Sequence, residues 1–345
     1  MSELAMQKPI PVPAPGSQVH WHLDPPYSFK HVLVVAAILM VLVLTGQRTE
    51  MGKMVAMTTE AAGKLLGIAD DSQVVRGLSR VATSMWPPVL GETEELSRLP
   101  ELERDRLPMF SRIEVQERIE QRLNPETLQL EAHAESVEML VKPIGYAVTV
   151  FVKMIETLEI ALWGTIIAVL LSAPLAYFAA RNYSPNRASY TTARGFISLL
   201  RSAPELIVAL FLVLAYGFGP IAGVLALGLH AAGFLGKFYA EDIENADPKP
   251  QEALEAIGAG KLKVLWYGVV PQVLPQYIAY TAYILDRNLR MATVIGLVGA
   301  GGIGQELKGR FDMFQYGHVM TILIAIFLFV FLLDQLSARI RAKLI

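Results

Sequence analysis

Six polar or charged residues lie inside two long apolar stretches of this sequence, where a charge is expensive. They are Arg201 and Glu205 in one stretch, and Asp286, Arg287, Asn288 and Arg290 in another. Ionisable groups at membrane depth usually face a cavity or an opposite charge. One interpretation is a path for an anion, because guanidinium groups bind oxyanions well. The other is a set of ion pairs that hold helices together, with Arg201 marking only a boundary and Glu205 as its partner.

A second group of residues favours a helix that contacts another protein. The run Glu252-Ala253-Leu254-Glu255-Ala256-Ile257-Gly258 lies between two apolar stretches, and Pro271 follows thirteen positions after the glycine. Alanines let a helix pack closely against a partner, carboxylates can pair with its basic groups, and a glycine lets the chain turn. The alternative is an ordinary surface helix, in which alanine is merely a good helix former.

The third motif is the glycine-rich run Gly299-Ala300-Gly301-Gly302-Ile303-Gly304, which fits the G-x-G-x-x-G pattern of dinucleotide-binding loops. That pattern indicates a nucleotide only within a βαβ unit. Here it lies between two apolar stretches. We therefore expect a closely packed turn or partly re-entrant loop at an external gate, formed by Gly299, Gly301, Gly302 and Gly304.

The composition identifies the class of protein that must position these residues. Of 345 residues, 53% are hydrophobic and 18% are charged, whereas a soluble domain has about 25% charged residues. The net charge of −2 argues against a basic nucleic-acid-binding protein. Without cysteine, disulfides and thiolate metal sites are excluded. No P-loop, serine elbow or histidine-rich metal motif is present, so we expect no catalytic residue, metal site or cofactor in this chain.

Six segments are apolar enough to cross a membrane as helices, which takes about 20 residues each. They are residues 32–46, 160–180, 196–216, 221–239, 276–298 and 313–333. Short loops rich in Arg and Lys stay in the cytoplasm. Four arginines between spans two and three, and three basic residues after span six, therefore predict cytoplasmic N- and C-termini, with residues 1–31 as a cytoplasmic tail.

An acidic block separates the first two spans and is expected outside the membrane. Gln47–Leu140 has 11 basic and 17 acidic residues, net −6, and the rest of the chain is net +4. Ser111–Glu114 has capping-box spacing before a helix over Val115–Leu123, and Asn124-Pro125 is typical of another helix start. Val141–Glu159 looks like an amphipathic interfacial helix. We expect residues 47–155 to be a mostly helical insertion, either a scaffold or a docking surface.

The run from Glu252 to Pro271 resembles the EAA motif of ATP-binding-cassette (ABC) importer permeases, with Leu254 and Val270 as departures from the usual Ala and Leu. The resemblance extends from about Glu156 to the end of the chain and is specific to phosphonate-importer permeases, or a close relative that carries phosphite or a related anion. The strings that carry it are Glu156–Thr165, Pro174–Ala176, Ala179–Asn182, Arg201–Leu206, Leu225–Gly228, Pro271–Pro275 and Gly296–Leu307.

The resemblance implies an all-α membrane protein with a type I ABC importer permease-like core of five spans at residues 156–345. It implies a cytoplasmic coupling helix near 251–265, whose Glu252, Ala253, Glu255, Ala256, Gly258 and Pro271 serve the ATPase contact. The implied partners are a second permease copy, ABC ATPase subunits that hold ATP and Mg, a soluble substrate-binding protein and membrane lipid, in a bacterial inner membrane. Short family members lack a block like Gly91–Thr149, so the resemblance implies nothing about the structure or function of that block.

Two other functions stay open. A permease of the same class could carry another small solute, such as methionine or a quaternary amine, and would differ only in the residues along the path. A membrane sensor or enzyme with an external domain would need a catalytic constellation, which the sequence does not show.

Overall fold

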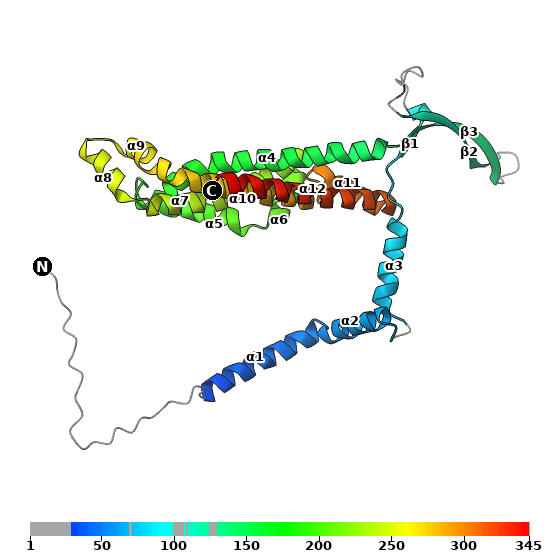
Figure 1. Cartoon of the computed structure of the whole chain (residues 1–345), viewed down its shortest axis with the longest axis horizontal. Coiled ribbons are helices and arrows are strands. Elements are labelled where there is room, and N and C mark those ends of the chain that lie inside the picture. The colour runs from blue at the N-terminus through cyan, green and yellow to red at the C-terminus, as the bar shows by residue number, and fades with distance from the viewer. Residues whose placement is uncertain (1–28, 69–70, 99–106, 108–109, 124–129, 345) are drawn as a thin grey trace. The chain divides into compact units, whose positions relative to one another are not determined.

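The computed structural model describes the chain except for residues 1–28, 69–70, 99–106, 108–109, 124–129 and 345 (Figure 1). Most of the expected N-terminal tail and the predicted Asn124-Pro125 helix start lie outside the described residues. The chain forms two compact units, Met1–Arg80 and Val81–Ile345. Helix α3 (Gln73–Met85) crosses the boundary between them.

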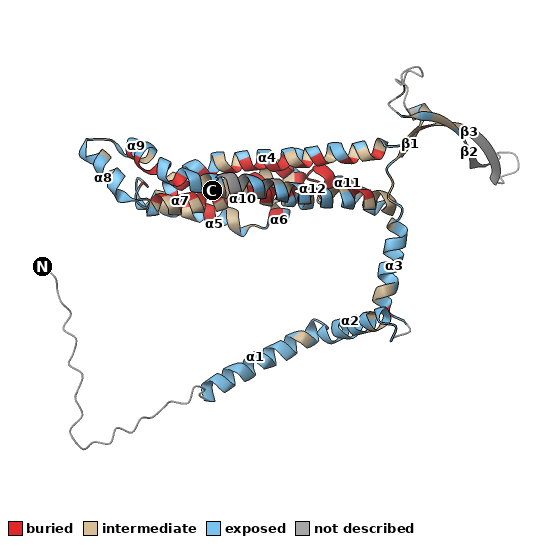
Figure 2. Cartoon of the chain, viewed as in Figure 1, coloured by how far each residue is buried: buried red, intermediate tan, exposed pale blue. Residues whose placement is uncertain are grey.

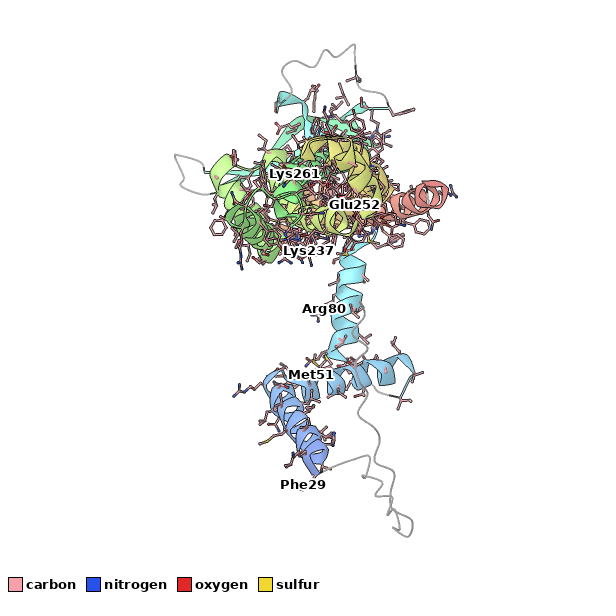
Figure 3. The ribbon with its side chains drawn as sticks, turned by 90° about the vertical axis from the view of Figure 1, so that its left-hand side faces the viewer. Phe29, Met51, Arg80, Lys237, Glu252 and Lys261 are labelled. Atoms are coloured by element: carbon pink, nitrogen blue, oxygen red, sulfur yellow. The ribbon has the colours of Figure 1, made fainter. Side chains whose placement is uncertain are left out.

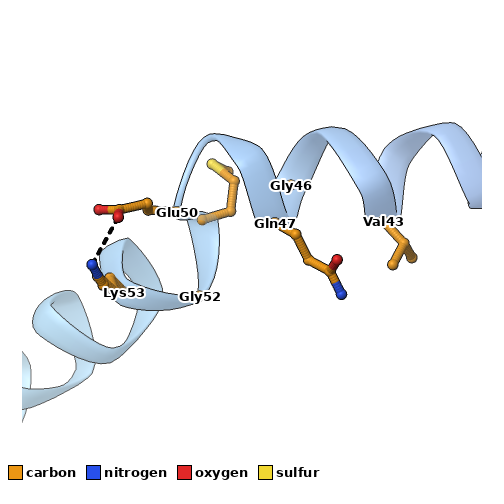
Figure 4. Close-up of a pocket in the computed structure, with 7 residues that line it drawn as sticks. Val43, Gly46, Gln47, Glu50, Gly52 and Lys53 are labelled. Atoms are coloured by element: carbon orange, nitrogen blue, oxygen red, sulfur yellow. Dashed lines mark hydrogen bonds and ion pairs between the residues drawn. The ribbon is translucent and has the colours of Figure 1, made fainter.

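The first unit contains α1 (Phe29–Arg48) and α2 (Met51–Leu65). No residue of α1 is buried, as expected for an apolar helix that lies in lipid (Figure 2). The two helices meet at Glu50, which has a left-handed φ of 54°. Figure 4 shows a surface pocket at this junction, where the Glu50 carboxylate pairs with Lys53 at 2.7 Å.

The second unit contains a three-stranded antiparallel sheet, so the predicted insertion combines helices with strands, whereas the described chain as a whole is mostly helical, as expected. Strands β1 (Glu92–Glu95), β2 (Arg112–Leu123) and β3 (Leu130–Lys142) have the order β1-β3-β2, and a 3₁₀ turn, η1 (Leu96–Arg98), follows β1. The predicted helix over Val115–Leu123 is a strand paired from Leu123↔Leu130 to Arg112↔Val141.

The sheet leads directly into α4 (Gly145–Ala179), a single helix of 35 residues. The helix predicted for Val141–Glu159 is present from Gly145 onward and continues without a break through the second predicted span, whereas Val141 and Lys142 belong to β3. At about 1.5 Å per residue, α4 is some 50 Å long, more than the roughly 30 Å of a bilayer core.

The core of the second unit consists of α4 packed against α7 (Pro220–Asn245), with α10 (Val270–Gly296), α11 (Gly302–Asp312) and α12 (Tyr316–Leu344) beside them. Glycines let α4 and α7 approach closely: a Cβ on Gly164 would lie 2.9 Å from Leu227, and one on Gly228 would lie 2.9 Å from Ile167. Figure 2 shows the buried faces of these helices turned toward one another. Small interfacial residues are typical of helix packing in membranes.

The predicted third span is broken. It consists of α5 (Arg187–Ser202) and α6 (Glu205–Tyr216), which bend by 90° at the Ala203-Pro204 connection. Proline at the break cannot continue the helix hydrogen bonds of α5. Both pieces contact α7.

Among the described residues, four helices are long and apolar enough to cross a membrane, α1, α4, α7 and the first part of α12, or five if α5 and α6 form one span. The predicted fifth span corresponds to α10, which is not among the counted helices. The arrangement with six spans stays a prediction.

Candidate functional site

The predicted coupling segment forms a short helix at one end of the second unit. Helix α8 (Pro248–Ala256) is followed by α9 (Lys261–Val264) and a π-helical turn, η2 (Leu265–Val269), which runs into α10. Figure 3 looks onto this end and labels Glu252 on α8 and Lys261 on α9. Asp247 caps α8, since its carboxylate accepts a hydrogen bond of 3.0 Å from the Lys249 backbone N–H.

One side of α8 packs on the chain, and the other side is exposed. A Cβ on Gly268 would lie 3.1 Å from Leu254, so the helix rests directly on that glycine. The predicted coupling residues Glu252, Ala253, Glu255, Ala256 and Gly258 are all exposed, and Pro271 lies in the first turn of α10.

Gly258 ends α8 with a left-handed φ of 85°, a conformation that costs a side chain about 1–2 kcal/mol. The turn closes with a 2.9 Å hydrogen bond from the Gly258 N–H to Glu255 O and one of 3.0 Å from the Ala259 N–H to Leu254 O. Apart from its own chain neighbours, none of the described residues lies within 4 Å of the place where a Gly258 side chain would begin.

Tyr183, in the turn between α4 and α5, connects α8 to the rest of the core. Its hydroxyl donates a hydrogen bond of 2.8 Å to Gln251. Burial, together with the negative charge of Glu255, raises the pKa of Tyr183 above its ordinary value, so the hydroxyl keeps its proton. The predicted motif did not include Tyr183, because no sequence pattern relates a residue 68 positions away to Gln251 of α8.

Five of the six predicted intramembrane residues fall into two clusters and one pair, and Arg201 forms no ion pair among the described residues. Asp286 and Arg290 form an ion pair at 2.8 Å, and Arg290 also reaches Asp334 of α12 at 3.1 Å. Asn288 donates a buried hydrogen bond of 3.0 Å to Thr165 of α4. These contacts connect α10 to α12 and α4, as the structural interpretation of the charges expected.

The other cluster crosses three helices. Arg287 of α10 forms an ion pair with Glu205, the first residue of α6. His230 of α7 lies 2.8 Å from the same carboxylate through Nε2, and its Nδ1 lies 3.1 Å from the Ala203 carbonyl at the break between α5 and α6. Glu205 is therefore paired with Arg287 across 82 positions of sequence, and Arg201 is not its salt-bridge partner.

The glycine-rich run forms the turn between α10 and α11 and the start of α11, so the elements that flank it are helices. Gly299, Gly301 and Gly302 have φ of 93°, 84° and 69°. The start of α11 is capped by α4: the Gly302 N–H donates to Glu156 at 2.9 Å, and the Ile303 N–H donates to the Thr157 hydroxyl at 2.8 Å. A carboxylate and a hydroxyl thus satisfy the free N–H groups of that helix end.

The packing around this turn leaves no room for side chains. A Cβ on Gly301 would lie 2.9 Å from Pro220, and one on Gly304 would collide with the Thr293 carbonyl. The Gly219 N–H donates a hydrogen bond of 3.0 Å to the Gly299 carbonyl. The turn is closely packed, as predicted, whereas the short helix α11 and its caps were not foreseen.

Comparison with known proteins identifies the family in which these features occur together in one chain. Residues 172–345 match the family described as binding-protein-dependent transport system inner membrane component. The chain is 76% identical over 261 residues to the putative phosphite transport system permease protein HtxE of Stutzerimonas stutzeri, covering 76% of this chain and 100% of that protein. It is 46% identical over 188 residues to the phosphite transport system permease protein PtxC of the same organism, covering 54% of this chain and 68% of that protein.

A solved chain of the MetNI methionine ABC transporter, in an inward-facing conformation, matches 57% of this chain and 96% of its own length, with a TM-score of 0.49 and 21% identity.

Since Glu156 to the C-terminus is 190 residues, the match to HtxE must include about 70 residues before Glu156. At least part of the inserted block is therefore shared with that relative. The chain belongs to the family of binding-protein-dependent transport system inner-membrane components, and it is a multi-pass permease subunit of an ABC importer rather than an enzyme.

Proposed function

We propose that this chain moves a small phosphorus oxyanion, phosphite or a phosphonate, into the cell, using ATP that a separate subunit hydrolyses. The observation that carries the proposal is the match to HtxE, a protein named for phosphite transport, at 76% identity over its whole length. A second relative, PtxC, is also named for phosphite transport.

Helix α8 is the proposed contact for the ATPase, which holds the ATP and Mg. Leu254, on the inner side of α8, packs directly on Gly268 of η2. A movement of α8 would therefore be transmitted to η2 and to α10, which follows it. The outer side of α8 presents Glu252, Ala253, Glu255 and Ala256, and the turn at Gly258 is free of the chain's own side chains.

The remaining parts of the assembly follow from the same proposal. A second permease copy pairs with this chain, a soluble binding protein delivers the anion from outside, and the complex lies in a bacterial inner membrane with both termini in the cytoplasm. The glycine-rich turn at 299–304 is the proposed element of the external gate, supported by its close packing on Pro220 and on Glu156 of α4.

The proposed translocation path uses the cluster around Arg287 and Glu205, with Arg201. Asp286, Arg290 and Asn288 were also candidates for the path. Asp286 pairs with Arg290, which also reaches Asp334 of α12. Asn288 donates a hydrogen bond to Thr165 of α4, and these contacts favour a structural role for all three residues.

The proposal is tested by uptake in proteoliposomes that contain the permease, its ATPase and its binding protein. We expect labelled phosphite or methylphosphonate to accumulate only when ATP is enclosed with the ATPase and the binding protein is outside. Methionine and glycine betaine serve as competing solutes. Accumulation of either of these, with no uptake of phosphite or methylphosphonate, would contradict the proposed cargo and support a permease of the same class for another solute.

A further inference from the structure

Two arginines from different helices meet at one aromatic ring. The guanidinium carbons of Arg201, on α5, and Arg287, on α10, each lie 4.9 Å from the ring centroid of Phe234, on α7. They are therefore at most twice that distance, 9.8 Å, apart. Phe234 lies near the middle of α7, and both arginines are half-buried there.

The charges of this cluster do not balance. Arg287 is paired with Glu205, whose carboxylate also contacts His230. Arg201 makes no ion pair within the described part of the chain, and its Nε atom is buried without a hydrogen-bond acceptor. Two guanidinium groups thus share one carboxylate. Because buried polar groups almost always find a partner, and an excess charge in a membrane is costly, the cluster lacks an anion.

The break between α5 and α6 places the cluster beside irregular backbone. Arg201 lies two residues before the Ala203-Pro204 connection, and Glu205 is the first residue after it. Non-helical backbone at membrane depth is tolerated where protein buries it or where it lines a cavity. Broken helices of this kind form the ion and substrate sites of other membrane transporters.

We propose that Arg201 and Arg287, on the ring of Phe234, form a transient binding site for the transported phosphorus oxyanion within the membrane. A phosphoryl group offers several oxygens to two guanidinium forks, each of which binds such oxygens through paired hydrogen bonds. Arg201 supplies the unpaired charge. Glu205 and His230 are positioning residues that hold Arg287 and compete with the anion for it. The inference rests on the proposed function, and it identifies where in the chain the cargo stops.

The competition by Glu205 explains how the site could release its cargo. A cage of free arginines would bind the anion too tightly for transport, whereas Arg287 can return to its carboxylate when the anion leaves. The neighbouring Arg290 cannot serve in the same way, because Asp286 and Asp334 both neutralise it.

The test is phosphite uptake by the complete complex in proteoliposomes. We expect Arg201→Gln to lower the uptake rate about tenfold or more, since charge-assisted hydrogen bonds are lost, while the ATPase still copurifies. Lys237→Met is the matched control: it removes a cation from α7 whose partner is Glu241, at 3.5 Å, and uptake should change less than about twofold. Wild-type uptake by Arg201→Gln would overturn the inference.

If Arg201→Gln does not assemble, Arg201→Lys decides, because lysine keeps the charge and loses the fork. We then expect several-fold slower uptake, and an unchanged rate overturns the site. A wild-type complex that imports neither phosphite nor methylphosphonate would instead refute the proposed function. If the wild type imports phosphite and the Arg201 substitutions leave the uptake rate unchanged, the binding site is refuted and the proposed function is not.

A lipid phosphate could also meet Arg201, and a second measurement separates the two sources. The detergent-purified complex of permease and ATPase, without binding protein, is melted with millimolar phosphite or with phosphatidylglycerol. We expect phosphite to raise the melting temperature of the wild type and not of Arg201→Gln, and the lipid to affect both equally. A shift that depends on Arg201 only with the lipid would assign the site to a headgroup and overturn the cargo assignment.

Discussion

Two turns of the permease core that contain glycine, at Gly258 and at residues 299–304, need glycine for different reasons. The turn at Gly258 has a left-handed φ of 85°, yet a side chain there would meet nothing within 4 Å. The turn that contains Gly301 and Gly304 is enclosed by Pro220 and Thr293 of its own chain. Gly258 is required by its backbone conformation on an exposed surface, whereas Gly301 and Gly304 are required by close packing.

This difference separates what the chain needs for its own fold from what it offers to a partner. Substitutions in the glycine-rich turn should damage the permease itself. Substitutions at Gly258 should leave the permease folded and affect its partner. The predictions below test this separation at each turn and then at the side chains that support each turn.

The largest effect is expected for Gly304→Val. The new side chain would collide with the Thr293 carbonyl and with Gly296, both on the backbone of α10. Because backbone cannot move aside cheaply, we expect destabilisation of about 3 kcal/mol or more. The measurement is the melting temperature of the purified protein and its yield in the membrane. Gly309→Val is the control, since Gly309 lies on the same helix with nothing within 4 Å. Equal losses in both variants would refute the role of packing.

The second prediction concerns docking at Gly258. Aspartate and asparagine both tolerate the left-handed region better than most residues, so Gly258→Asp and Gly258→Asn should melt close to the wild type. Only the aspartate adds a charge to the proposed ATPase contact. We expect Gly258→Asp to weaken ATPase binding about tenfold or more, and Gly258→Asn to weaken it much less. Equal ATPase affinity in the two variants would show that the turn does not face the ATPase.

The coupling helix could be predicted because its information is local. Alanines and carboxylates, followed by a glycine and a proline at fixed spacing, lie within twenty residues, and the structure has α8 and its glycine turn at that place. Its supports were not predicted. Tyr183 reaches Gln251 across 68 positions, and no local pattern relates the two.

The β-hairpin shows how a local pattern can mislead. Val115, Ile119 and Leu123 recur every four residues, as on a helix, and Ser111 and Glu114 have capping-box spacing. The segment is nevertheless a strand, because β2 pairs with β3 along its whole length. In β3, the alternation of Val137, Met139 and Val141 was a signal for a strand that the expectation of a mostly helical insertion overlooked.

The charged residues inside the apolar stretches could be identified from the sequence, whereas the pairing of Glu205 with Arg287 could not. Residue types identify Arg287 as costly in a membrane, but its contact with Glu205 depends on how α6 and α10 pack. The separation of Arg287 from Arg290, three positions apart with different partners, is a property of the fold. The contact of His230 with Glu205 likewise depends on how α7 packs beside the start of α6.

The third prediction returns to the glycine-rich turn and its cap. Thr157→Val keeps the side-chain volume and removes the acceptor of the Ile303 N–H, which is buried. An unsatisfied buried donor costs about 1–3 kcal/mol, so the melting temperature should fall and the backbone amides at the start of α11 should exchange faster. Thr149→Val is the control, because its hydroxyl bonds only to Gly145 within the same helix. Equal exchange at α11 in both variants would refute the cap.

The smallest effect is expected at the coupling end, for Tyr183→Phe. The substitution removes the hydrogen bond to Gln251 and leaves α8 held by its packing on Gly268 and by the hydrogen bond of 3.0 Å from the Asp247 N–H to Gln272. A neutral hydrogen bond contributes about 0.5–1.5 kcal/mol. We therefore expect faster amide exchange in α8, with little change in the melting temperature of the core.

The pH dependence of this bond has a defined sign. The folded-state pKa of Tyr183 is raised by burial and by Glu255, so the protonated hydroxyl is the stabilised form. Its contribution is fully present below the unfolded pKa of about 10 and is lost as the pH rises through the higher folded value. The difference in α8 exchange between wild type and Tyr183→Phe should thus be constant from pH 6 to about pH 9. A difference that disappears within that range would show that another group, and not this hydroxyl, holds α8 to the core.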